Sequence, residues 1–383
     1  MVVTLLLALV QTAGTVTSGQ RPGFSAGAFD PLVLEGIRSL VYPGAALVIG
    51  TRDSILFAKA YGRFTWSPRS AAVSVDSTLW DLASLTKVVA TTPALMLLVE
   101  RGKVDLDAPV ARYLPEFNAT GTAVITVRHL LTHTSGLRGT LPLREAPDSG
   151  AALRMVLTTT PMAAPGARMV YSDLNAILLG EIVGRVSGLP LDEFVAREVY
   201  APLGFNEQMM FRPARRLERR IAPTGIWRGH AIAGVVNDPH AAKLGGVAGH
   251  AGVFATAMGV ARFAQFMLRD GAPLLKPETV HSFTAIAVPA RRGTSARTLG
   301  WEALPTGEEV SSAGRLLGPR TYGHTGWTGT SLWIDPDRGL FVLLLTNRAY
   351  AQARGARGTF TVLKEVRGRV ANAAARAADA RHR

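Results

Sequence analysis

"WDLASLTKVV", residues 80–89, contains the Ser-x-x-Lys pattern on which the interpretation of this chain depends. Ser84 and Lys87 are three positions apart, so on a helix both side chains project from one face. The positive end of a helix favours an oxyanion, and a buried lysine beside another cation can become a neutral amine that accepts the serine proton. The pattern allows two interpretations: a nucleophile with its base, or a helix-start serine followed by a solvated lysine.

The surrounding sequence favours the catalytic interpretation. With 18 Ser and six Lys in the chain, about 0.3 such pairs are expected by chance, so the spacing alone is weak evidence. "YSDLN", residues 171–175, places a tyrosine between a Pro-Gly loop and a predicted helix. "HTGWTG", residues 324–329, precedes a predicted hairpin, where backbone N–H groups can face a substrate carbonyl. Three such elements in this order are far less expected by accident.

At this point the chain resembles a known family, the penicillin-recognising serine hydrolases. It is most similar to the branch that holds class C β-lactamases, D-alanyl-D-alanine carboxypeptidases and related esterases. The stretches that carry the resemblance stand in the family's order and cover most of the chain from about residue 30: residues 79–117, 125–137, 171–188, 245–257 and 323–336.

The resemblance implies a role for each matching residue. Ser84 would be the acylated nucleophile, Lys87 would assist its deprotonation, and Tyr171 would pass the proton to the leaving group and later help to activate water. The backbone N–H groups of Ser84 and Trp327 would form the oxyanion hole. Three further residues would line the opposite wall of the cleft: His324, Thr325 and Gly326.

Two positions depart from the β-lactamase pattern. His324 stands where many β-lactamases carry lysine, and a neutral imidazole attracts a substrate carboxylate less strongly. Asp173 stands where the pattern has asparagine, and a carboxylate cannot donate a hydrogen bond to a substrate amide, although it can pair with Lys87. Both changes favour esters over β-lactams. Arg348 is a candidate for the missing positive charge.

Other histidines are weaker candidates. His129 and His133 are four positions apart on a predicted helix that ends at Ser135-Gly136, as zinc ligands can be, but there is no His-Glu-x-x-His motif. The resemblance makes this segment a structural helix and turn. His250 lies in a glycine-rich turn, and both a structural and a catalytic role remain open. We expect no metal and no organic cofactor.

Composition excludes several classes of protein. The chain has 383 residues and a formal charge of +14, but the basic residues are nearly all scattered arginines without a nucleic-acid motif. We therefore expect no nucleic-acid partner. Cysteine is absent, which excludes disulfides, thiol catalysis and thiolate-bound zinc. The hydrophobic share of 48% is typical of a globular chain.

The N-terminal residues suggest export. Residues 2–10 form an apolar run followed by small residues, like the core and cleavage region of a signal peptide, although a basic start is missing. We interpret residues 1–24 as a signal peptide or leader, with a buried strand or helix as the alternative. The run is too short for a stable membrane span. A periplasmic or secreted location is expected, and a cytoplasmic one remains open.

The element pattern predicts an α+β fold. Apolar runs around residues 43–64 and 329–348 predict hairpins, and the long segment between them is mostly helical, with a break at Pro93 and a last helix near the C-terminus. We expect an α/β sandwich, with an antiparallel sheet flanked by helices, from residues about 25–80 and 250–383. A mostly helical part would be inserted at about 81–249, within a single hydrolase module.

The sequence leaves three functions to compare. The first is a serine hydrolase that acts through an acyl-enzyme on small esters or D-Ala-terminated peptides, with peptidoglycan-derived peptides as one candidate source. The second is a class C-type β-lactamase. The third is a penicillin- or peptidoglycan-binding protein without turnover. Oligomeric state is not indicated by any feature of the sequence.

Overall fold

The computed structural model describes residues 23–205, 207–291, 295–304, 311–353, 355 and 358–381. Within them, a six-stranded antiparallel sheet has the strand order β2-β1-β11-β10-β9-β8. Its strands are β1 (Gly44–Thr51), β2 (Ile55–Gly62), β8 (Glu302–Ala303), β9 (Tyr322–Thr325), β10 (Ser331–Asp335) and β11 (Leu340–Thr346). The signal-peptide prediction concerns residues that lie, apart from 23 and 24, outside the described part.

The two ends of the chain share this sheet. β1 pairs with β11 from Ala45 opposite Thr346 to Thr51 opposite Leu340. Both strands are almost entirely apolar and buried, as expected for strands that are covered on both faces. This arrangement confirms the predicted fold class of an antiparallel sheet flanked by helices.

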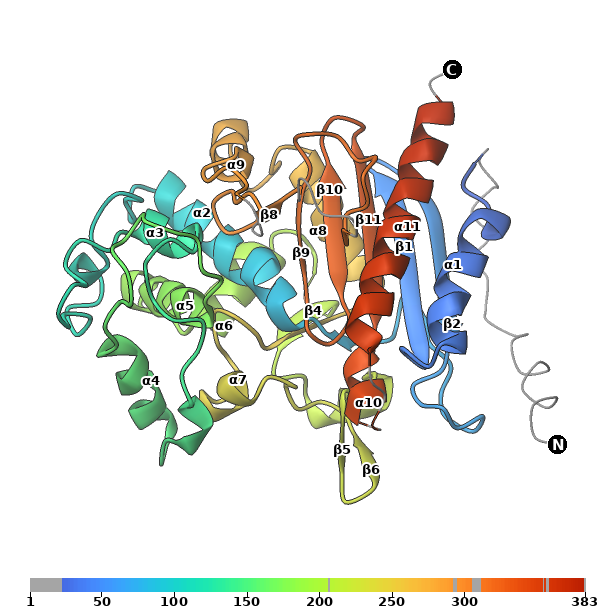
Figure 1. The fold of residues 1–383 in the computed structure, drawn as a ribbon, viewed down its shortest axis with the longest axis horizontal. Helices are drawn as coiled ribbons and strands as arrows, with labels where there is room; N and C mark the ends of the chain where they lie inside the picture. Colours follow the sequence, from blue (N-terminus) through green and yellow to red (C-terminus); the bar gives the residue numbers. More distant parts are fainter. Residues whose placement is uncertain are drawn as a thin grey trace.

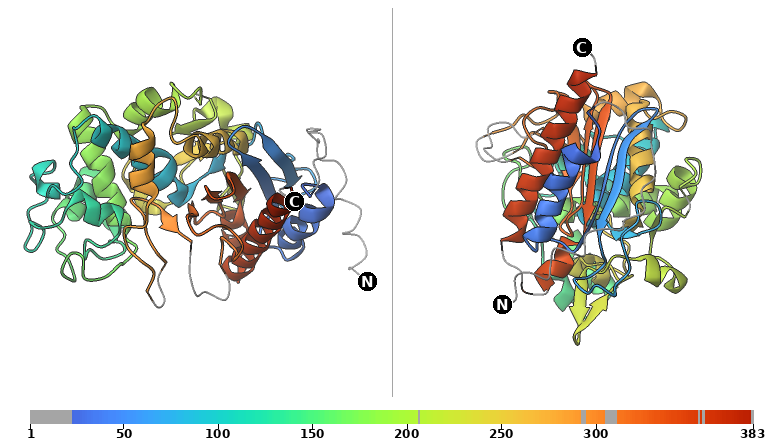
Figure 2. Two further views of the ribbon diagram at one scale, coloured as in Figure 1. Left: turned by 90° about the horizontal axis from the view of Figure 1, so that it is seen from above. Right: turned by 90° about the vertical axis from the view of Figure 1, so that its right-hand side faces the viewer.

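Helices cover both faces of the sheet. α1 (Ala26–Arg38) and α11 (Thr359–Ala380) lie side by side on one face, and α8 (Ala257–Leu268) lies on the other (Figures 1 and 2). Side chains of β1 alternate between the two layers: Leu47 belongs to the cluster beneath α1 and α11, and Val48 belongs to the cluster beneath α8. This alternation joins both cores through a single sheet.

A second, mostly helical part lies beside the sheet (Figure 1). Its elements, with small sheets and single turns, are α2 (Thr92–Glu100), η3 (Val110–Arg112), α3 (Val127–Leu131), η4 (Leu143–Glu145), α4 (Ser149–Leu157), α5 (Asp173–Ser187), α6 (Leu191–Phe194), η5 (Val195–Tyr200), β4 (Met209–Phe211), η6 (Arg215–Arg220), β5 (Gly225–Trp227), β6 (His230–Ile232) and α7 (Pro239–Lys243). Four further elements are β3 (Trp80–Asp81), β7 (Val253–Ala255), α9 (Pro277–Thr284) and α10 (Arg348–Ala353).

The helical segment that carries Ser84 is composite. A 3-10 turn, η1 (Ala83–Leu85), leads into a π-helical turn, η2 (Lys87–Thr91), and the α-helix α2 begins at Thr92. The restart at Pro93 agrees with the sequence, because proline fits the first turn of a helix. The stretch Ala83–Glu100 is long and apolar enough to cross a membrane, but 83% of it is buried inside the fold, as in a core helix.

One predicted helix is shorter than the sequence suggested. α3 ends at Leu131, and His133 follows it with a positive φ of 56°. His129 therefore does not share a helix face with His133, and its Nδ1 instead lies 3.2 Å from the backbone nitrogen of Thr126, at the helix start. The two histidines that are spaced like zinc ligands therefore have separate roles: His129 caps the start of α3, and His133 lies in the turn that follows the helix.

Candidate active site

Ser84 lies in a turn that its neighbours hold firmly. Ala83, directly before it, has a φ of 47°, a conformation that costs energy for any residue other than glycine. The carboxylate of Asp81 accepts a hydrogen bond from the Ala83 N–H at 2.9 Å and another from the Asn237 N–H at 2.6 Å. Asp81, which lies in β3 directly before the strained turn, therefore stabilises it, and the backbone of the distant Asn237 holds Asp81 in place.

Lys87 connects Ser84 to the helical part. Its Nζ lies 3.0 Å from Ser84 Oγ, 2.8 Å from Asp173 Oδ1 and 3.2 Å from the His250 carbonyl oxygen. Burial acts to lower the pKa of Lys87, but the nearby Asp173 and Tyr171 outweigh it, so this pKa is raised. The same ion pair lowers the pKa of Asp173 against the opposing effect of its burial. Lys87 is therefore an ammonium, rather than the neutral amine that the Ser-x-x-Lys pattern allows.

Tyr171 completes the contacts around the nucleophile. Its phenol donates a hydrogen bond to Ser84 Oγ at 3.0 Å. Two cations flank its ring: Lys87 Nζ is 5.0 Å and the guanidinium carbon of Arg297 is 5.5 Å from the ring centroid. Two positive charges therefore lie against the ring of the residue that contacts the nucleophile.

Two neutral imidazoles border Tyr171. The rings of His133 and His324 lie 4.7 and 5.8 Å from the tyrosine ring, centroid to centroid. Burial, with a smaller effect from the charges of Lys87 and Arg297, lowers the pKa of His324 to about 3. Burial and the same two cations lower the pKa of His133 well below its ordinary value. Neither imidazole supplies positive charge at neutral pH, as expected for His324.

The turn after β9 packs directly on the nucleophile's turn. The Thr330 hydroxyl donates to the Leu82 carbonyl at 2.9 Å. A Cβ on Gly326 would lie 2.5 Å from the same carbonyl oxygen, so this close approach requires glycine. β9 ends at Thr325, and Trp327, whose side chain is exposed, follows in this turn. The next residue, Thr328, donates its hydroxyl hydrogen to the Asp81 carbonyl at 2.7 Å.

Arg348 does not point into the cleft as a free charge. It is buried, and its guanidinium donates to the Trp327 carbonyl through Nε at 3.1 Å and also through Nη2. Its Nη1 donates to Gln352 at 2.9 Å and to Thr359 at 3.2 Å. These contacts hold the Trp327 peptide in place.

His250 contributes through its backbone and through a carboxylate. Its carbonyl accepts from Lys87, and its Nε2 lies 3.0 Å from Asp238 Oδ1. Ligand atoms of Asp173, Asp238 and His250 lie within 4.8 Å of one another, which is a donor set that suits a cation. The Lys87 ammonium already forms an ion pair with Asp173. A positive charge from the protein therefore already lies next to these three side chains.

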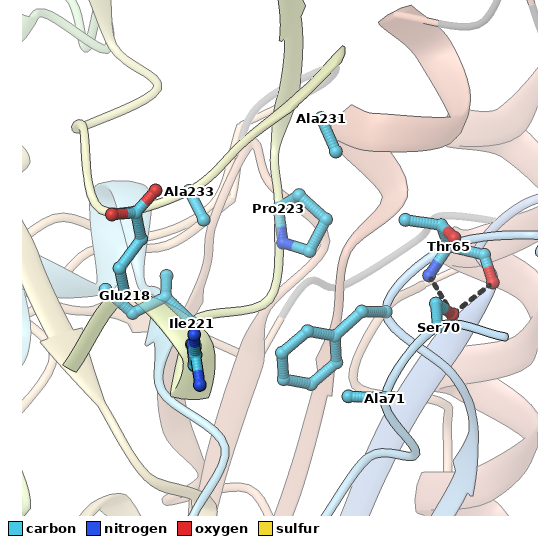
Figure 3. A pocket seen from close by; sticks show the side chains of 10 residues that line it. Thr65, Ser70, Ala71, Glu218, Ile221, Pro223, Ala231 and Ala233 are labelled. Carbon is cyan, nitrogen blue, oxygen red and sulfur yellow. Dashed lines mark hydrogen bonds between the residues drawn. The ribbon is translucent and has the colours of Figure 1, made fainter. Parts of the chain in front are cut away.

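A cavity of about 400 Å³ lies away from this chemistry, between the 64–71 loop and residues 218–233 (Figure 3). Thr65 and Ser70, joined by a hydrogen bond, form one side of it, and Glu218 and Pro223 form another. None of the residues that line it contacts Ser84 or Lys87 through any described hydrogen bond, so we do not assign the chemistry to it.

Of the residues that the sequence singled out, Lys87 and Tyr171 contact Ser84, Asp173 pairs with Lys87, and His324 lies against Tyr171. The structure also adds four that sequence reasoning missed: Asp81, His133, Asp238 and Arg297. The sequence suggested for His133 either a zinc ligand or a place in a structural helix and turn. Arg297 stands in no motif, so no local signal in the sequence pointed to it.

Comparison with known proteins agrees with this geometry. The family model described as Beta-lactamase matches residues 29–365. An Escherichia coli K12 protein named "Putative D-alanyl-D-alanine carboxypeptidase" is 32% identical over 350 residues, which cover 81% of this chain and 79% of that protein.

Solved structures share the fold at lower identity. EstCE1, described as a hydrolase with promiscuous acyltransferase activity, aligns with a TM-score of 0.73 at 22% identity, covering 90% of this chain and 98% of that one. A class C β-lactamase aligns with a TM-score of 0.71 at 19% identity, covering 89% and 95%. Because the family model spans most of the sequence, the chain belongs to the beta-lactamase family of serine hydrolases.

Proposed function

We propose that this chain hydrolyses small esters or D-Ala-terminated peptides through an acyl-enzyme on Ser84. The observation that carries the proposal is the position of Ser84 Oγ, 3.0 Å from both Lys87 Nζ and the Tyr171 phenol oxygen. A serine hydroxyl is a weak nucleophile until a neighbouring group takes its proton. The name of the Escherichia coli relative supports a peptide that ends in D-alanine as one substrate class.

In the proposed acylation, Tyr171 is the base. The raised pKa of Lys87 keeps that group protonated, so it assists by stabilising a Tyr171 phenolate rather than by taking the proton itself. Ser84 Oγ attacks the substrate carbonyl carbon and its proton moves to the phenolate. The bond to the leaving group then breaks, and Tyr171 returns the proton to the departing oxygen or nitrogen.

Deacylation reverses these roles. Tyr171 takes a proton from water, the hydroxide attacks the acyl carbon, and the proton returns to Ser84 as the acid leaves. The backbone N–H groups of Ser84 and Trp327 would stabilise the oxyanion in both steps. Trp327 suits this role because Thr330 and Gly326 hold its turn against the nucleophile's turn.

Substrate choice and location are part of the proposal. Asp173 accepts from Lys87 at 2.8 Å and has no hydrogen to donate to a substrate amide, which favours esters over β-lactams. The apolar residues 2–10 support action outside the cytoplasm.

The test combines turnover with mass spectrometry. We predict that Ser84→Ala removes hydrolysis of p-nitrophenyl acetate, whereas Ser282→Ala, at an exposed helix position, leaves it unchanged. Lys87→Ala should lower kcat by at least about 10²–10³-fold. If the Ser84→Ala protein keeps more than about 1% of the wild-type activity, the loss is too small for the removal of a nucleophile. That result would contradict the proposal.

Incubation with a penicillin separates the alternatives. A stable adduct mapped to Ser84 would indicate a penicillin-binding site with slow deacylation. Rapid Ser84-dependent loss of the penicillin would indicate a β-lactamase. The absence of both, together with ester turnover, is the result that we expect.

A further inference from the structure

His250, for which the sequence left both a structural and a catalytic role open, lies at the tip of a tight turn. The backbone groups of Ala248 and Ala251 bond to each other at 3.3 Å in both directions, so Gly249 and His250 form the tip. A Cβ on Gly249 would clash with a backbone carbonyl of α5. The Thr91 hydroxyl donates to the Gly249 carbonyl at 2.7 Å. The tip therefore packs between α5 and the helical segment that carries the nucleophile.

The carbonyl of His250 completes the hydrogen bonds of Lys87. An ammonium carries three hydrogens and accepts none. Three acceptors surround Lys87 Nζ: Ser84 Oγ at 3.0 Å, the Asp173 carboxylate at 2.8 Å and the His250 carbonyl at 3.2 Å. When one ammonium hydrogen points at Ser84 Oγ, the hydroxyl hydrogen is left for the Tyr171 oxygen, 3.0 Å away. The His250 carbonyl thus helps to set the orientation of the group that aligns the nucleophile.

The imidazole of His250 is tied to Asp238. The residue is 1% exposed, and its Nε2 lies 3.0 Å from Asp238 Oδ1. Its Nδ1 is buried without a hydrogen-bond partner in the part of the chain that the structure describes. A second N–H there would be buried without an acceptor, so the arrangement fits an imidazole with its single hydrogen on Nε2. Because Gly249 has no side chain, this hydrogen bond is the side-chain anchor of the tip.

Asp238 is itself held in place. Its Oδ1 caps α7, where it accepts from the backbone N–H groups of His240 at 2.9 Å and Ala241 at 2.8 Å. Burial acts to raise the pKa of Asp238, but the hydrogen bonds from His250 and Ala241 outweigh it, so this pKa is lowered. The anchor of the imidazole is therefore a fixed carboxylate.

Residues 237 and 238 together support both halves of the site. Asn237 donates its N–H to the Asp81 carboxylate at 2.6 Å, and Asp81 stabilises the turn of the nucleophile. Asp238, the next residue, accepts from His250, whose carbonyl accepts from Lys87. No hydrogen bond described for Asp238 reaches the nucleophile or the lysine directly, so its influence on them passes through the His250 turn.

We propose that Asp238 and His250 are positioning residues whose mutual hydrogen bond holds Lys87 in the orientation that aligns Ser84 with Tyr171. The inference rests on the proposed function, because it assigns further roles within the same site. A displacement of about 1 Å in a reacting group can cost about 10²-fold in rate. Loss of the hydrogen bond should therefore lower kcat and leave KM nearly unchanged.

The first test compares two amides at position 250. The amide nitrogen of glutamine takes the place of imidazole Nε2, whereas that of asparagine takes the place of Nδ1. His250→Gln therefore keeps a donor for Asp238, and His250→Asn removes it. On p-nitrophenyl acetate we expect kcat to fall about 10–100-fold in His250→Asn, with KM changed less than about threefold, and to stay within about threefold of the wild type in His250→Gln. Equal losses in the two variants would overturn the proposal.

The second test removes the carboxylate. Asp148→Ala is the matched control for Asp238→Ala, because Asp148 caps α4 by accepting from the Ala151 N–H at 2.7 Å. Both variants should lower Tm through the lost cap, but only Asp238→Ala should lower kcat, by about 10–100-fold. Asp238→Asn keeps an acceptor oxygen and should retain most of the activity. A folded Asp238→Ala protein with the kcat of Asp148→Ala would overturn the proposal. If Asp238→Ala does not fold, the two variants at position 250 decide.

Labelling of Ser84 by a fluorophosphonate, followed by intact mass, separates the inference from the function. Labelling slowed about 10-fold or more by His250→Asn but not by His250→Gln, without Ser84-dependent ester or peptide turnover in the wild type, would uphold the inference and overturn the proposed function. Ester turnover that depends on Ser84, with kcat and labelling rate unchanged in His250→Asn, would overturn the inference and leave the proposed function in place. A wild-type protein with neither turnover nor labelling of Ser84 would overturn both.

Discussion

The Lys87 ammonium and the Asp173 carboxylate form an ion pair of 2.8 Å between residues 86 positions apart. Lys87 follows the nucleophile's turn and Asp173 begins α5, so the pair ties the two sides of the site together. Because the lysine is almost fully buried, its charge depends on this partner. The ion pair thus sets both the geometry and the protonation state around Ser84.

Removing the Asp173 charge should change activity and stability in different ways. In Asp173→Asn an oxygen acceptor remains for Lys87, but the pKa of Lys87 should fall because its anionic partner is gone. We therefore expect the alkaline limb of the kcat profile for ester hydrolysis to move to lower pH. Asp173→Ala should cost about 3–5 kcal/mol of unfolding free energy, since it leaves a buried ammonium unpaired.

Urea denaturation and pH-dependent kinetics check this prediction. Glu116→Ala removes one side of the exposed pair with Arg185 and should alter neither quantity appreciably. An Asp173→Asn enzyme with an unshifted alkaline limb would show that the Lys87 charge does not govern the reaction.

Arg348 should influence the reaction through Trp327 rather than through the substrate. In Arg348→Ala the Trp327 carbonyl loses its donor, and the neighbouring N–H should shift away from the developing oxyanion. We expect kcat to fall about 10–100-fold with KM little changed. Steady-state kinetics on a neutral ester and a thermal melt provide the readouts.

The control for Arg348 is Arg369→Ala, which removes an exposed partner of Glu35. It should leave kcat unchanged. A folded Arg348→Ala protein with wild-type kcat, or with a loss confined to carboxylate substrates, would contradict the proposed role.

Acid should destabilise the fold through its buried imidazoles. The pKa of His324 is lowered to about 3 and that of His133 also lies well below 6.5, so the unfolded chain binds protons that the native chain does not. The contribution of His324 is present above about pH 6.5 and is lost as the pH falls towards 3, by about 1.4 kcal/mol per pH unit, and His133 acts in the same direction. Asp81, whose pKa burial raises to about 6, acts in the opposite direction between about pH 6 and 4.

A comparison with His324→Asn isolates one of these contributions. Denaturation midpoints at pH 7, 6, 5 and 4 should fall less steeply for this variant than for the wild type. Parallel slopes would mean that His324 is protonated in the folded protein near its ordinary pKa.

Much of the fold could be predicted from local patterns. Apolar runs separated by short polar turns predicted the hairpins of β1 with β2 and β10 with β11, and both pairs are antiparallel. The helix restart at Pro93 followed from the missing N–H of proline. The end of α3 could not be predicted, because His133 turns away from the helix to lie against Tyr171, which comes from another segment.

The sequence by itself determined the group around the nucleophile, because each member stands in a short motif: Ser84 and Lys87 three positions apart, Tyr171 before a helix, and His324 before a hairpin. Only the tertiary structure decided their charges and the remaining neighbours. Protonation depends on burial and on partners from distant segments, as with Lys87 and Asp173. Arg297 comes next to Tyr171 through packing alone, and no spacing within the sequence encodes a contact between segments so far apart.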